Sequence, residues 1–408
     1  LKGKDSLTEQ LCSNYFEVDG KPLGERNPKW LNDDYVKFIR FGQWRIERTG
    51  YGVLAFVTNH GYLDNPTFRG MRQSLIKTFD DIYVLDLHGN SKKKERCPDG
   101  SKDENVFDIQ QGVSINIFVK HPNGEKEKAT VHHTDLWGNR DLKYNWLEKN
   151  DLTTTQWTTL HPQSPFYLFI PQDNDLRAEY KEGWKVTDIF PINSVGIVTG
   201  QDSKTIAITE DDTKTLANSH RINQQCVKPI LYRPFDNRFI VYDAQVVTRP
   251  RREVMQHMLA GKNLGLITCR QQSQPGEWSL SGVTNSIIES CAVSNKTKEI
   301  NSLFPLYVYP ETAIEEGMGM KKHPNFSPEF LSKLESLLGY TPAPENIFYY
   351  IYAIFYSPTY RDRYAEFLKI DFPRIPLTSN DELFHQLADY GEQLVQLHLM
   401  KSPKLDSL

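Results

Sequence analysis

The sequence is poor in the features that mark disulfide-bonded, zinc-binding and membrane proteins. Its five cysteines are widely separated and form no C-x-x-C pair. This spacing excludes a recognisable cysteine zinc site and a disulfide framework, and it favours a reducing, cytoplasmic location. The most apolar run, Ile347–Tyr356, is too short to span a bilayer and contains four tyrosines. We therefore expect no membrane segment and predict that this run forms a core helix.

The sequence also lacks an overall positive charge. Its formal net charge is −4 at pH 7, and 25% of the residues are charged. A chain of 408 residues can bury two or three hydrophobic cores, and the composition is that of an ordinary soluble protein. Any binding to nucleic acid must therefore depend on local clusters of basic residues.

A strand–helix–strand–loop–strand pattern occupies residues 50–119. Val53–Thr58 is an unbroken apolar run, which predicts a strand buried on both faces as in a parallel sheet. Asn65 and Pro66 are typical of a helix start, and Asp81–Leu87 and Gly112–Val119 follow as two further strands. The pattern predicts the closing end of an open α/β sheet.

Four segments of this region resemble the late motifs of adenine-specific DNA methyltransferases, in particular those of single-polypeptide restriction–modification enzymes. They are Gly52–Asn59, Phe68–Leu75, Asp86–Asn90 and Val106–Ser114. Two later segments, Tyr232–Arg238 and Tyr360–Pro376, are similar to the target-recognition region of the same enzymes. The resemblance implies transfer of a methyl group from S-adenosylmethionine to adenine in double-stranded DNA. The adenine must leave the helix for that reaction, and no metal is needed.

Two motifs of that family are missing. No Gly-rich cofactor turn follows a first strand, and Gly50–Gly52 is better explained as a helix-ending turn. No Asn/Asp-Pro-Pro-aromatic tetrad is present, because Asn27–Trp30 and Asn65–Phe68 both lack the second proline. The first residue, Leu1, is not an initiator methionine. We therefore expect a carboxy-terminal piece of a longer enzyme, whose missing amino-terminal part is its partner, without methyltransferase activity or tight S-adenosylmethionine binding of its own.

The predicted architecture has three parts. Residues 1–125 form a partial α/β methyltransferase sheet, the distal half of a Rossmann-like sheet. Residues 126–325 form an α+β target-recognition domain, in which Phe166–Ile170 is one of several short predicted strands. Residues 326–408 form its helical carboxy-terminal part. Ser327 is predicted to cap a helix that Gly339 ends, and Ser357 to cap a helix that runs through Lys369. The last helix is expected to bury Leu383, Leu387, Leu394 and Leu397. A helix over Asp33–Arg48, stopped by Gly50, has a broad apolar stripe that includes Phe38 and Phe41 and is expected to cover the first strand of the sheet.

Two residues are candidates for the target-base pocket. Asn59 ends the first predicted strand, and ligands of open α/β sheets bind beyond the carboxyl ends of the strands. It could instead simply close the following turn. Phe107 matches, through the resemblance, an aromatic ring that packs against the extruded base, and its alternative role is a core residue. His60 has no partner at metal-ligand spacing, so we predict a structural or solvent-facing role and no metal site.

Residues 225–275 form a basic window, with eight Lys or Arg against three Asp or Glu. The segment 248–252 is predicted to start a helix, capped by Thr248 or Arg249, where arginines suit phosphate binding. Residues 269–276 are rich in the Arg and Gln side chains that read base edges. Within the window, Arg233 and Arg238 are expected to form internal ion pairs. The predicted DNA contacts are Arg249, Arg251, Arg252, Arg270, Gln271 and Gln272.

The sequence thus predicts a protein that recognises a DNA sequence and forms part of a target-base pocket. The alternative is a free-standing, sequence-specific DNA-binding subunit without catalysis. That alternative requires a complete domain at the amino end, and the half-sheet predicted there argues against it.

Overall fold

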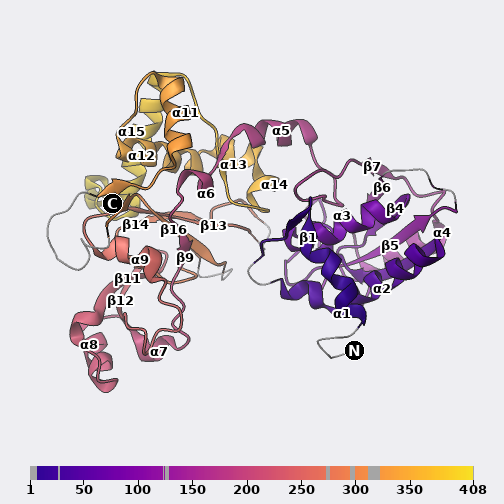
Figure 1. Ribbon diagram of the computed structural model, residues 1–408, viewed down its shortest axis with the longest axis horizontal. Coiled ribbons are helices and arrows are strands. Elements are labelled where there is room, and N and C mark those ends of the chain that lie inside the picture. The colour runs from indigo at the N-terminus through magenta and orange to yellow at the C-terminus, as the bar shows by residue number, and fades with distance from the viewer. Residues whose placement is uncertain are drawn as a thin grey trace. The chain divides into compact units, whose positions relative to one another are not determined.

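The computed structural model describes residues 7–25, 28–122, 124, 128–272, 276–294, 299–310 and 322–407. The chain forms two compact units, Leu1–Asn174 and Asp175–Leu408 (Figure 1). The elements of the first unit are α1 (Leu7–Cys12), β1 (Glu17–Val18), β2 (Lys21–Pro22), α2 (Asp34–Thr49), β3 (Gly52–Asn59), α3 (Arg69–Thr78), β4 (Asp81–Asp86), β5 (Val113–Lys120), β6 (Thr130–Asp135), α4 (Arg140–Lys149) and β7 (Thr158–Leu160).

Within the described residues, the main sheet of the first unit has five strands in the order β3-β5-β4-β6-β7. The strand β5 is antiparallel to both of its neighbours, β3 and β4, while β4 and β6 are parallel. Consequently β3, β4 and β6 run in the same direction, and their carboxyl ends meet at one edge of the sheet. In open α/β sheets, ligands bind beyond the carboxyl ends of the strands, that is, beyond such an edge.

The strand β3 differs from the prediction of a strand buried on both faces. It lies at the edge of the sheet and pairs, among the described strands, with β5 alone. Its side chains alternate, and Val53 and Val57 on one face are 65% and 49% exposed. A continuous apolar run predicts burial only when another element covers each face of the sheet, and none of the described elements covers this face of β3. Because β5 runs antiparallel to both of its neighbours, the sheet is mixed and not parallel as predicted.

The helices α2 and α3 cover the opposite face. Ile39 and Ile46 of α2 pack in one core with Leu75 of α3 and with Ile82 and Phe118 of the sheet. The predicted end of α2 is confirmed, because Gly50 adopts φ +82° and donates its N–H to the carbonyl of Ile46 at 2.9 Å. The broad apolar stripe predicted for this helix is only partly buried, since Phe38 is 52% and Phe41 42% exposed.

The sequence-based boundary after residue 125 falls inside this unit. The strand β6 lies beyond it and extends the sheet by pairing with β4 over six residues, Thr130–Asp135. The helix α4 then packs Trp146 and Leu147 against a small core that includes Leu85 and Leu87. The predicted strand at residues 166–170 is not a strand. These residues form turns, and Phe169 completes the core beneath α3.

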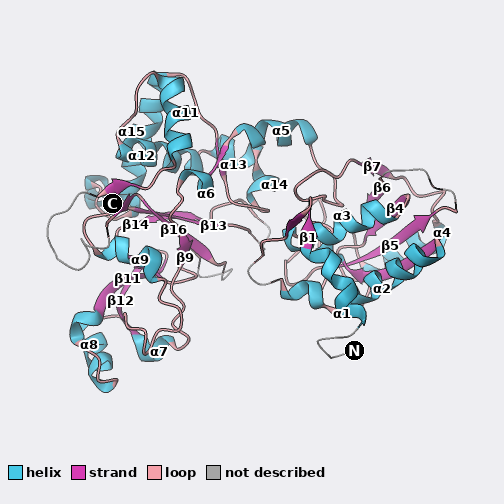
Figure 2. Cartoon of the chain, in the orientation of Figure 1, coloured by secondary structure: helices cyan, strands magenta, loops and turns pink. Residues whose placement is uncertain are grey.

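The second unit contains several small sheets and a group of helices (Figure 2). Its elements are α5 (Asn174–Glu182), β8 (Trp184–Lys185), α6 (Val186–Ile189), β9 (Ser194–Val195), α7 (Asp202–Thr205), β10 (Ile206–Ala207), α8 (Glu210–Ser219), β11 (Val227–Arg233), β12 (Asp236–Val241), α9 (Arg252–Leu259), β13 (Gly265–Cys269), β14 (Ser281–Thr284), β15 (Ile287–Ile288), β16 (Asn301–Pro305), β17 (Tyr307–Val308), β18 (His323–Pro324), α11 (Pro328–Leu338), α12 (Pro344–Tyr356), α13 (Pro358–Arg363), α14 (Ala365–Leu368), β19 (Arg374–Ile375) and α15 (Asp381–His398).

The sheet β14-β13-β16-β9 separates two cores of this unit. Leu266 and Phe304 point into a core shared with the aromatic helix α12 and with α15. Ile267 and Leu303, the neighbours of Leu266 and Phe304 in their strands, point into a second core shared with α9 and with the sheet β10-β12-β11-β15. Because strand side chains alternate between faces, one buried sheet joins the helical part to the rest of the unit.

The helix boundaries predicted near the carboxyl end are largely confirmed. Ser327 caps α11, Gly339 ends it in a left-handed conformation, and Ser357 caps α13. The predicted helix from residue 358 to 369 is interrupted at Tyr364, giving α13 and α14. The buried stripe of α15 is shifted from the predicted leucines to Phe384, Ala388, Gly391 and Val395. No helix in the described part of the chain is long and apolar enough to cross a membrane.

Candidate functional site

Polar side chains gather where β3, β4 and β6 end. Asn59 ends β3 and His60 follows it, Asp86 ends β4 and His88 comes two residues later, and Asp135 ends β6. Since these strands run in one direction, sheet geometry brings together residues that are up to 76 positions apart in the sequence. Because the three strands share one direction, Asn59 and His60 lie at the same edge of the sheet as Asp86 and Asp135.

The turn after β4 has a tightly specified backbone. The carboxylate of Asp86 accepts the N–H of His88 at 2.9 Å, and His88 and Gly89 adopt φ values of +51° and +81°. A side chain on Gly89 would collide with the backbone of Asn105, which returns from the following loop. Asn105 in turn donates its side-chain amide to the carbonyl of Gly89 at 3.1 Å. The segment Asp86–Asn90 thus turns sharply and points His88 back over the sheet edge.

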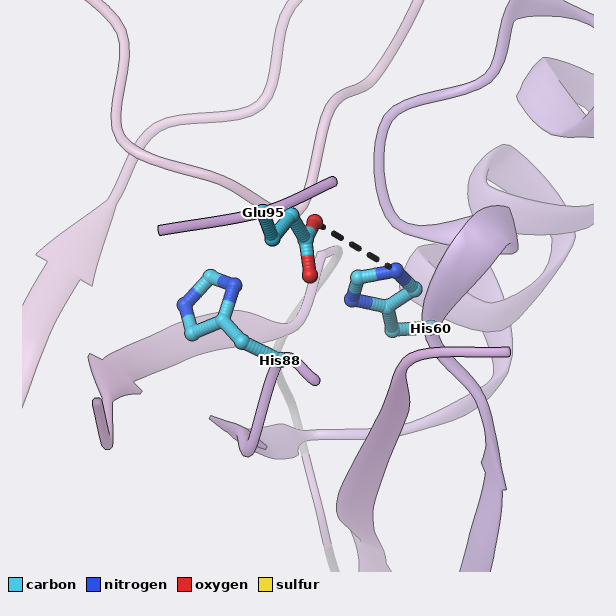
Figure 3. A group of neighbouring side chains, drawn as sticks. All are labelled: His60, His88 and Glu95. Atoms are coloured by element: carbon cyan, nitrogen blue, oxygen red, sulfur yellow. Dashed lines mark ion pairs between the residues drawn. The ribbon is translucent and has the colours of Figure 1, made fainter. Parts of the chain in front are cut away.

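The imidazoles of His60 and His88 each contact a carboxylate. Nδ1 of His60 lies 3.0 Å from Oδ1 of Asp86, and Nε2 of His88 lies 2.8 Å from Oδ1 of Asp135. Glu95 reaches the group from the loop after β4, with Oε1 3.9 Å from Nε2 of His60. We call His60, Asp86, His88, Glu95 and Asp135 the histidine–carboxylate cluster; its His60, His88 and Glu95 are shown in Figure 3.

The electrostatics of the cluster favour a protonated His60 and an ionised Asp86. Burial alone would lower the pKa of His60, but the carboxylates of Asp86 and Glu95 outweigh it, and the pKa is raised. Burial would likewise raise the pKa of Asp86, but the two imidazoles outweigh it and lower that pKa to about 2. His60 is only 6% exposed, so the solvent-facing alternative is wrong for this residue. Its role as an internal partner of Asp86 was invisible in the sequence because 26 residues separate the two.

The two predicted pocket residues lie in different settings. The side chain of Asn59 accepts the N–H of Gly61 at 2.8 Å and so caps the turn that follows β3. The side-chain oxygen of Asn59 therefore closes the turn, which is the alternative to ligand binding that the sequence suggested for this residue. Phe107 is 44% exposed and belongs to none of the hydrophobic cores. It is therefore not a core residue, and its ring is accessible.

The helix α4 holds the segment that carries Phe107. Nε of Arg140 donates to the carbonyl of Asn105 at 2.8 Å, and the Tyr144 hydroxyl donates to that of Val106 at 2.5 Å. The fully buried Lys143 forms a 2.7 Å ion pair with Asp103 and donates to the carbonyls of Leu87 and Glu104. The backbone around Phe107 is thus fixed, while its ring remains outside the core.

The basic window of the second unit contains both structural and exposed arginines. Arg233 forms a 2.6 Å ion pair with Glu289, and Arg238 pairs with Asp236 at 2.8 Å. Both guanidinium groups also lie over the ring of Tyr232, with carbon-to-centroid distances of 4.0 and 4.2 Å. The prediction of internal ion pairs for these two arginines is confirmed.

The helix start predicted within residues 248–252 is confirmed, but the predicted caps Thr248 and Arg249 are wrong. Thr248 and Arg249 are extended and pair with residues 198–199 through backbone hydrogen bonds of 2.9–3.2 Å. The helix α9 instead begins at Arg252, and Arg251 precedes it in a left-handed conformation, φ +54°, without a side-chain cap. The side chains of Arg249 and Arg252 are exposed and that of Arg251 is half-buried. The structure therefore brings these three arginines together around the start of α9.

The predicted base-reading segment is tied to the helical part. Nε of Arg270 lies 3.3 Å from Asp371, which also pairs with Lys185 at 2.6 Å. The N–H of Gln272 donates to the carbonyl of Lys369 at 3.1 Å, and Gln271 is half-buried. Part of the glutamine-rich segment, residues 273–275, lies outside the described residues. No observation tests whether Arg270, Gln271 or Gln272 contacts a base, so these contacts remain predictions.

Comparisons with known proteins identify the second unit. Residues 173–408 match a family model described as the Type ISP C-terminal specificity domain. A search of curated proteins finds no match.

Three solved structures resemble 98% of the chain. They are a DrdV–DNA complex determined by cryo-EM (TM-score 0.74, 21% identity, 42% of that chain), the ATP-dependent Type ISP restriction–modification enzyme LlaBIII bound to DNA (0.74, 21%, 28%), and a nuclease-deletion mutant of the Type ISP enzyme LlaGI with a DNA substrate mimic (0.71, 18%, 33%). At these identities the likeness shows a shared fold. The chain spans less than half the length of each of these proteins.

Proposed function

Because this chain belongs to the Type ISP C-terminal specificity domain family, we propose that its second unit recognises a DNA sequence for a restriction–modification enzyme. The observation that carries this proposal is the family match over residues 173–408, which includes every predicted DNA contact. The three similar structures are themselves complexes with DNA or a DNA mimic. The exposed arginines at the start of α9 suit phosphate binding, which positions a protein on DNA, while Arg and Gln side chains can distinguish bases.

The first unit, in this proposal, forms part of the target-base pocket of an adenine-specific methyltransferase. The pocket lies at the carboxyl ends of β3 and β4. A base that leaves the duplex loses its stacking partners, and an accessible aromatic ring can replace some of that energy. Phe107 is suited to this role because its ring is exposed while α4 holds its backbone. Asn59 would act indirectly, by shaping the turn beside the pocket.

In this proposal, the described residues of the chain do not form the cofactor turn for S-adenosylmethionine, which supplies the methyl group in such enzymes. The nearest glycine pair, Gly50 and Gly52, ends α2 and begins β3, and Gly52 packs against the side chain of Ile46. These glycines lie at the amino end of β3, whereas the cofactor turn of this family follows a strand. We expect the cofactor to bind to other polypeptide of the enzyme, and this chain alone to have no methyltransferase activity.

The edge strand β3 supports the presence of such additional polypeptide. The strand is eight residues long, Gly52–Asn59, and one of its faces exposes Val53 and Val57. Long apolar edges are normally paired or covered, because they would otherwise promote aggregation. We propose that the missing amino-terminal part of the same polypeptide pairs with β3 and completes a Rossmann-like sheet. In this proposal the enzyme is cytoplasmic, which suits the five widely separated cysteines of the sequence.

The proposed recognition can be tested with the chain as it stands. Random duplex DNA would be selected on the immobilised protein through several rounds and sequenced. Specific recognition should enrich one short sequence, and the affinity for it should exceed that for unrelated DNA. Failure to enrich any sequence, with equal affinities for all duplexes, would contradict DNA recognition by this unit.

Variants then separate the two classes of contact. Arg252→Ala should weaken binding to cognate and unrelated DNA equally and reduce the salt dependence, because phosphate contacts are independent of sequence. Gln271→Ala should cost roughly 1–3 kcal/mol on the cognate sequence alone and relax the preference at one base pair. Lys333→Ala is the matched control, since Lys333 is an exposed basic residue of the same unit outside the basic window. Equal effects of Arg252→Ala and Gln271→Ala on all DNA would refute the assignment of the reading segment.

A further inference from the structure

The histidine–carboxylate cluster contains three donor atoms that converge on one point. One ring nitrogen of His60, one of His88 and a carboxylate oxygen of Glu95 all lie within 4.8 Å of one another (Figure 3). His60 and His88 are buried, and Glu95 is half-buried. These residues come from the ends of two strands and from the loop after β4, so only the folded sheet brings them together.

In the neutral form of the two imidazoles, their hydrogen bonds leave the converging nitrogens unprotonated. Carboxylates accept hydrogen bonds, so Nδ1 of His60 donates to Asp86 at 3.0 Å and Nε2 of His88 donates to Asp135 at 2.8 Å. The remaining nitrogens, Nε2 of His60 and Nδ1 of His88, then present lone pairs toward the centre of the cluster. A carboxylate behind each histidine is the arrangement that orients metal-binding imidazoles in proteins.

Asn90 independently supports this tautomer of His60. Its Oδ1 accepts the N–H of Lys93 at 3.0 Å, which fixes the orientation of the side-chain amide. The amide nitrogen therefore faces Nε2 of His60 at 3.3 Å, where it can only donate. The hydrogen bond is long, so this nitrogen is weakly engaged and remains able to bind a cation.

The surroundings of Nδ1 of His88 favour a bound cation. It is buried without a hydrogen-bond partner, and the nearest charged atom is Oδ2 of Asp86 at 3.7 Å. His88 is 8% exposed, so water does not readily satisfy this nitrogen. A lone pair facing a carboxylate is unfavourable in a buried setting, and a cation between them removes the conflict. Asp86, Glu95 and Asp135 place three carboxylates around the two imidazoles, and their negative charge attracts a cation.

We propose that His60, His88 and Glu95 bind a divalent transition-metal ion, with Zn²⁺ as the best match. Two imidazole nitrogens and one carboxylate oxygen are typical zinc ligands, and three protein ligands leave one position for water. Metal–ligand bonds of about 2.0–2.2 Å place tetrahedral donors roughly 3.4 Å apart, so binding draws the three side chains inward. Asp86 and Asp135 act as positioning residues, because each already accepts a hydrogen bond from a ligating histidine.

Such an ion would fasten the loop between β4 and β5 to the ends of two strands. Glu95 belongs to this loop, and so does Phe107. The loop spans residues 87–112, which α4 holds mainly at its far end, around residues 103–107. The ion would restrain the near end, around Asn90 and Glu95. The proposal concerns an ion that restrains this loop, and it does not depend on the proposed methyltransferase function.

The test is metal binding by the full chain after treatment with a chelator. Titration with Zn²⁺ against a chromophoric chelator should show one tight site, and Co²⁺ should give the visible absorption of a tetrahedral ion. Glu95→Gln should weaken binding at least tenfold, since it removes the ligand charge and retains an oxygen that can accept the N–H of Asn90. Asp135→Asn should weaken it about 10- to 100-fold through the orientation of His88.

Two further measurements keep the result interpretable. His121→Ala alters an exposed histidine of the same unit and should leave the tight site unchanged. Hydrogen exchange should show slower exchange in residues 88–96 when Zn²⁺ is added to the unaltered protein, and no such change in Glu95→Gln. The proposal is overturned if no tight equivalent binds, or if Glu95→Gln and Asp135→Asn bind as tightly as the unaltered chain. Nitrogen chemical shifts showing a second proton on His88 in the presence of Zn²⁺ would also overturn it.

Discussion

Replacing Phe107 by alanine separates a role in a base pocket from a role in folding. The ring is 44% exposed, so truncation removes only part of the apolar contact that a core phenylalanine makes. On an area basis, the loss in the free energy of unfolding should be roughly 1 kcal/mol, against about 3–5 kcal/mol for a core phenylalanine. The backbone contacts from Arg140 and Tyr144 do not involve the ring and should persist.

The effect on methyl transfer should be larger than the effect on stability. Stacking of a base on an aromatic side chain contributes roughly 1–3 kcal/mol, which corresponds to about a 5- to 150-fold change in rate if it is lost from the reacting complex. We expect Phe107→Ala to slow single-turnover adenine methylation by this factor when the chain is combined with the polypeptide that completes the enzyme. Affinity for duplex DNA should change little, because the DNA contacts are predicted in the second unit.

The assay would place a fluorescent adenine analogue at the target position. Its emission rises when the base unstacks and should be quenched again when it packs on Phe107, so the variant should keep the first change and lose the second. Ile109→Ala is the matched control, because Ile109 lies on the same loop and is 49% exposed but has no aromatic ring. The reasoning fails if Ile109→Ala slows methylation equally, or if Phe107→Ala lowers the free energy of unfolding by about 3 kcal/mol or more.

Three further predictions concern stability and assembly. Lys143→Met should lower the free energy of unfolding of the first unit by roughly 3–5 kcal/mol in urea titrations, because it strands a buried carboxylate, whereas Lys102→Ala, at a pair on the surface, should have almost no effect. Burial lowers the pKa of His257, and Nδ1 of its neutral ring accepts the N–H of Tyr309, so the neutral form stabilises the fold. The free energy of unfolding should therefore fall as the pH drops through about 6.5. His257→Asn should reduce that dependence on pH. Val57→Lys should leave the stability of the chain within about 0.5 kcal/mol but weaken its binding to the completing polypeptide in calorimetry; unchanged binding would argue against pairing at β3.

Local sequence signals determined much of the secondary structure. Gly50 was predicted to end a helix and does so with a positive φ, and Ser327 and Ser357 were predicted to cap helices and do so. These features depend on the conformational freedom of one glycine or on one hydroxyl oxygen near free N–H groups, so neighbouring residues suffice to define them. The sequence also identified the family of restriction–modification enzymes, because the resembling segments are long.

Features that depend on distant neighbours were not determined locally. The apolar run at Val53–Thr58 predicted a strand, but only the sheet order showed that β3 is an edge strand with one exposed face. Similarly, the start of α9 moved to Arg252 because residues 248–249 pair with a segment about 50 positions earlier. Local preferences give way when long-range backbone pairing satisfies the same hydrogen-bonding groups.

The histidine–carboxylate cluster is the clearest case of a site decided by tertiary structure. His60, His88 and Glu95 have no regular spacing, and nothing near His60 in the sequence offers it a ligand partner. They meet because β3 and β4 run in one direction and the turn at His88 and Gly89 folds back over their ends. The sequence determined which side chains were available for this edge. Strand direction and a left-handed turn decided which of them converge.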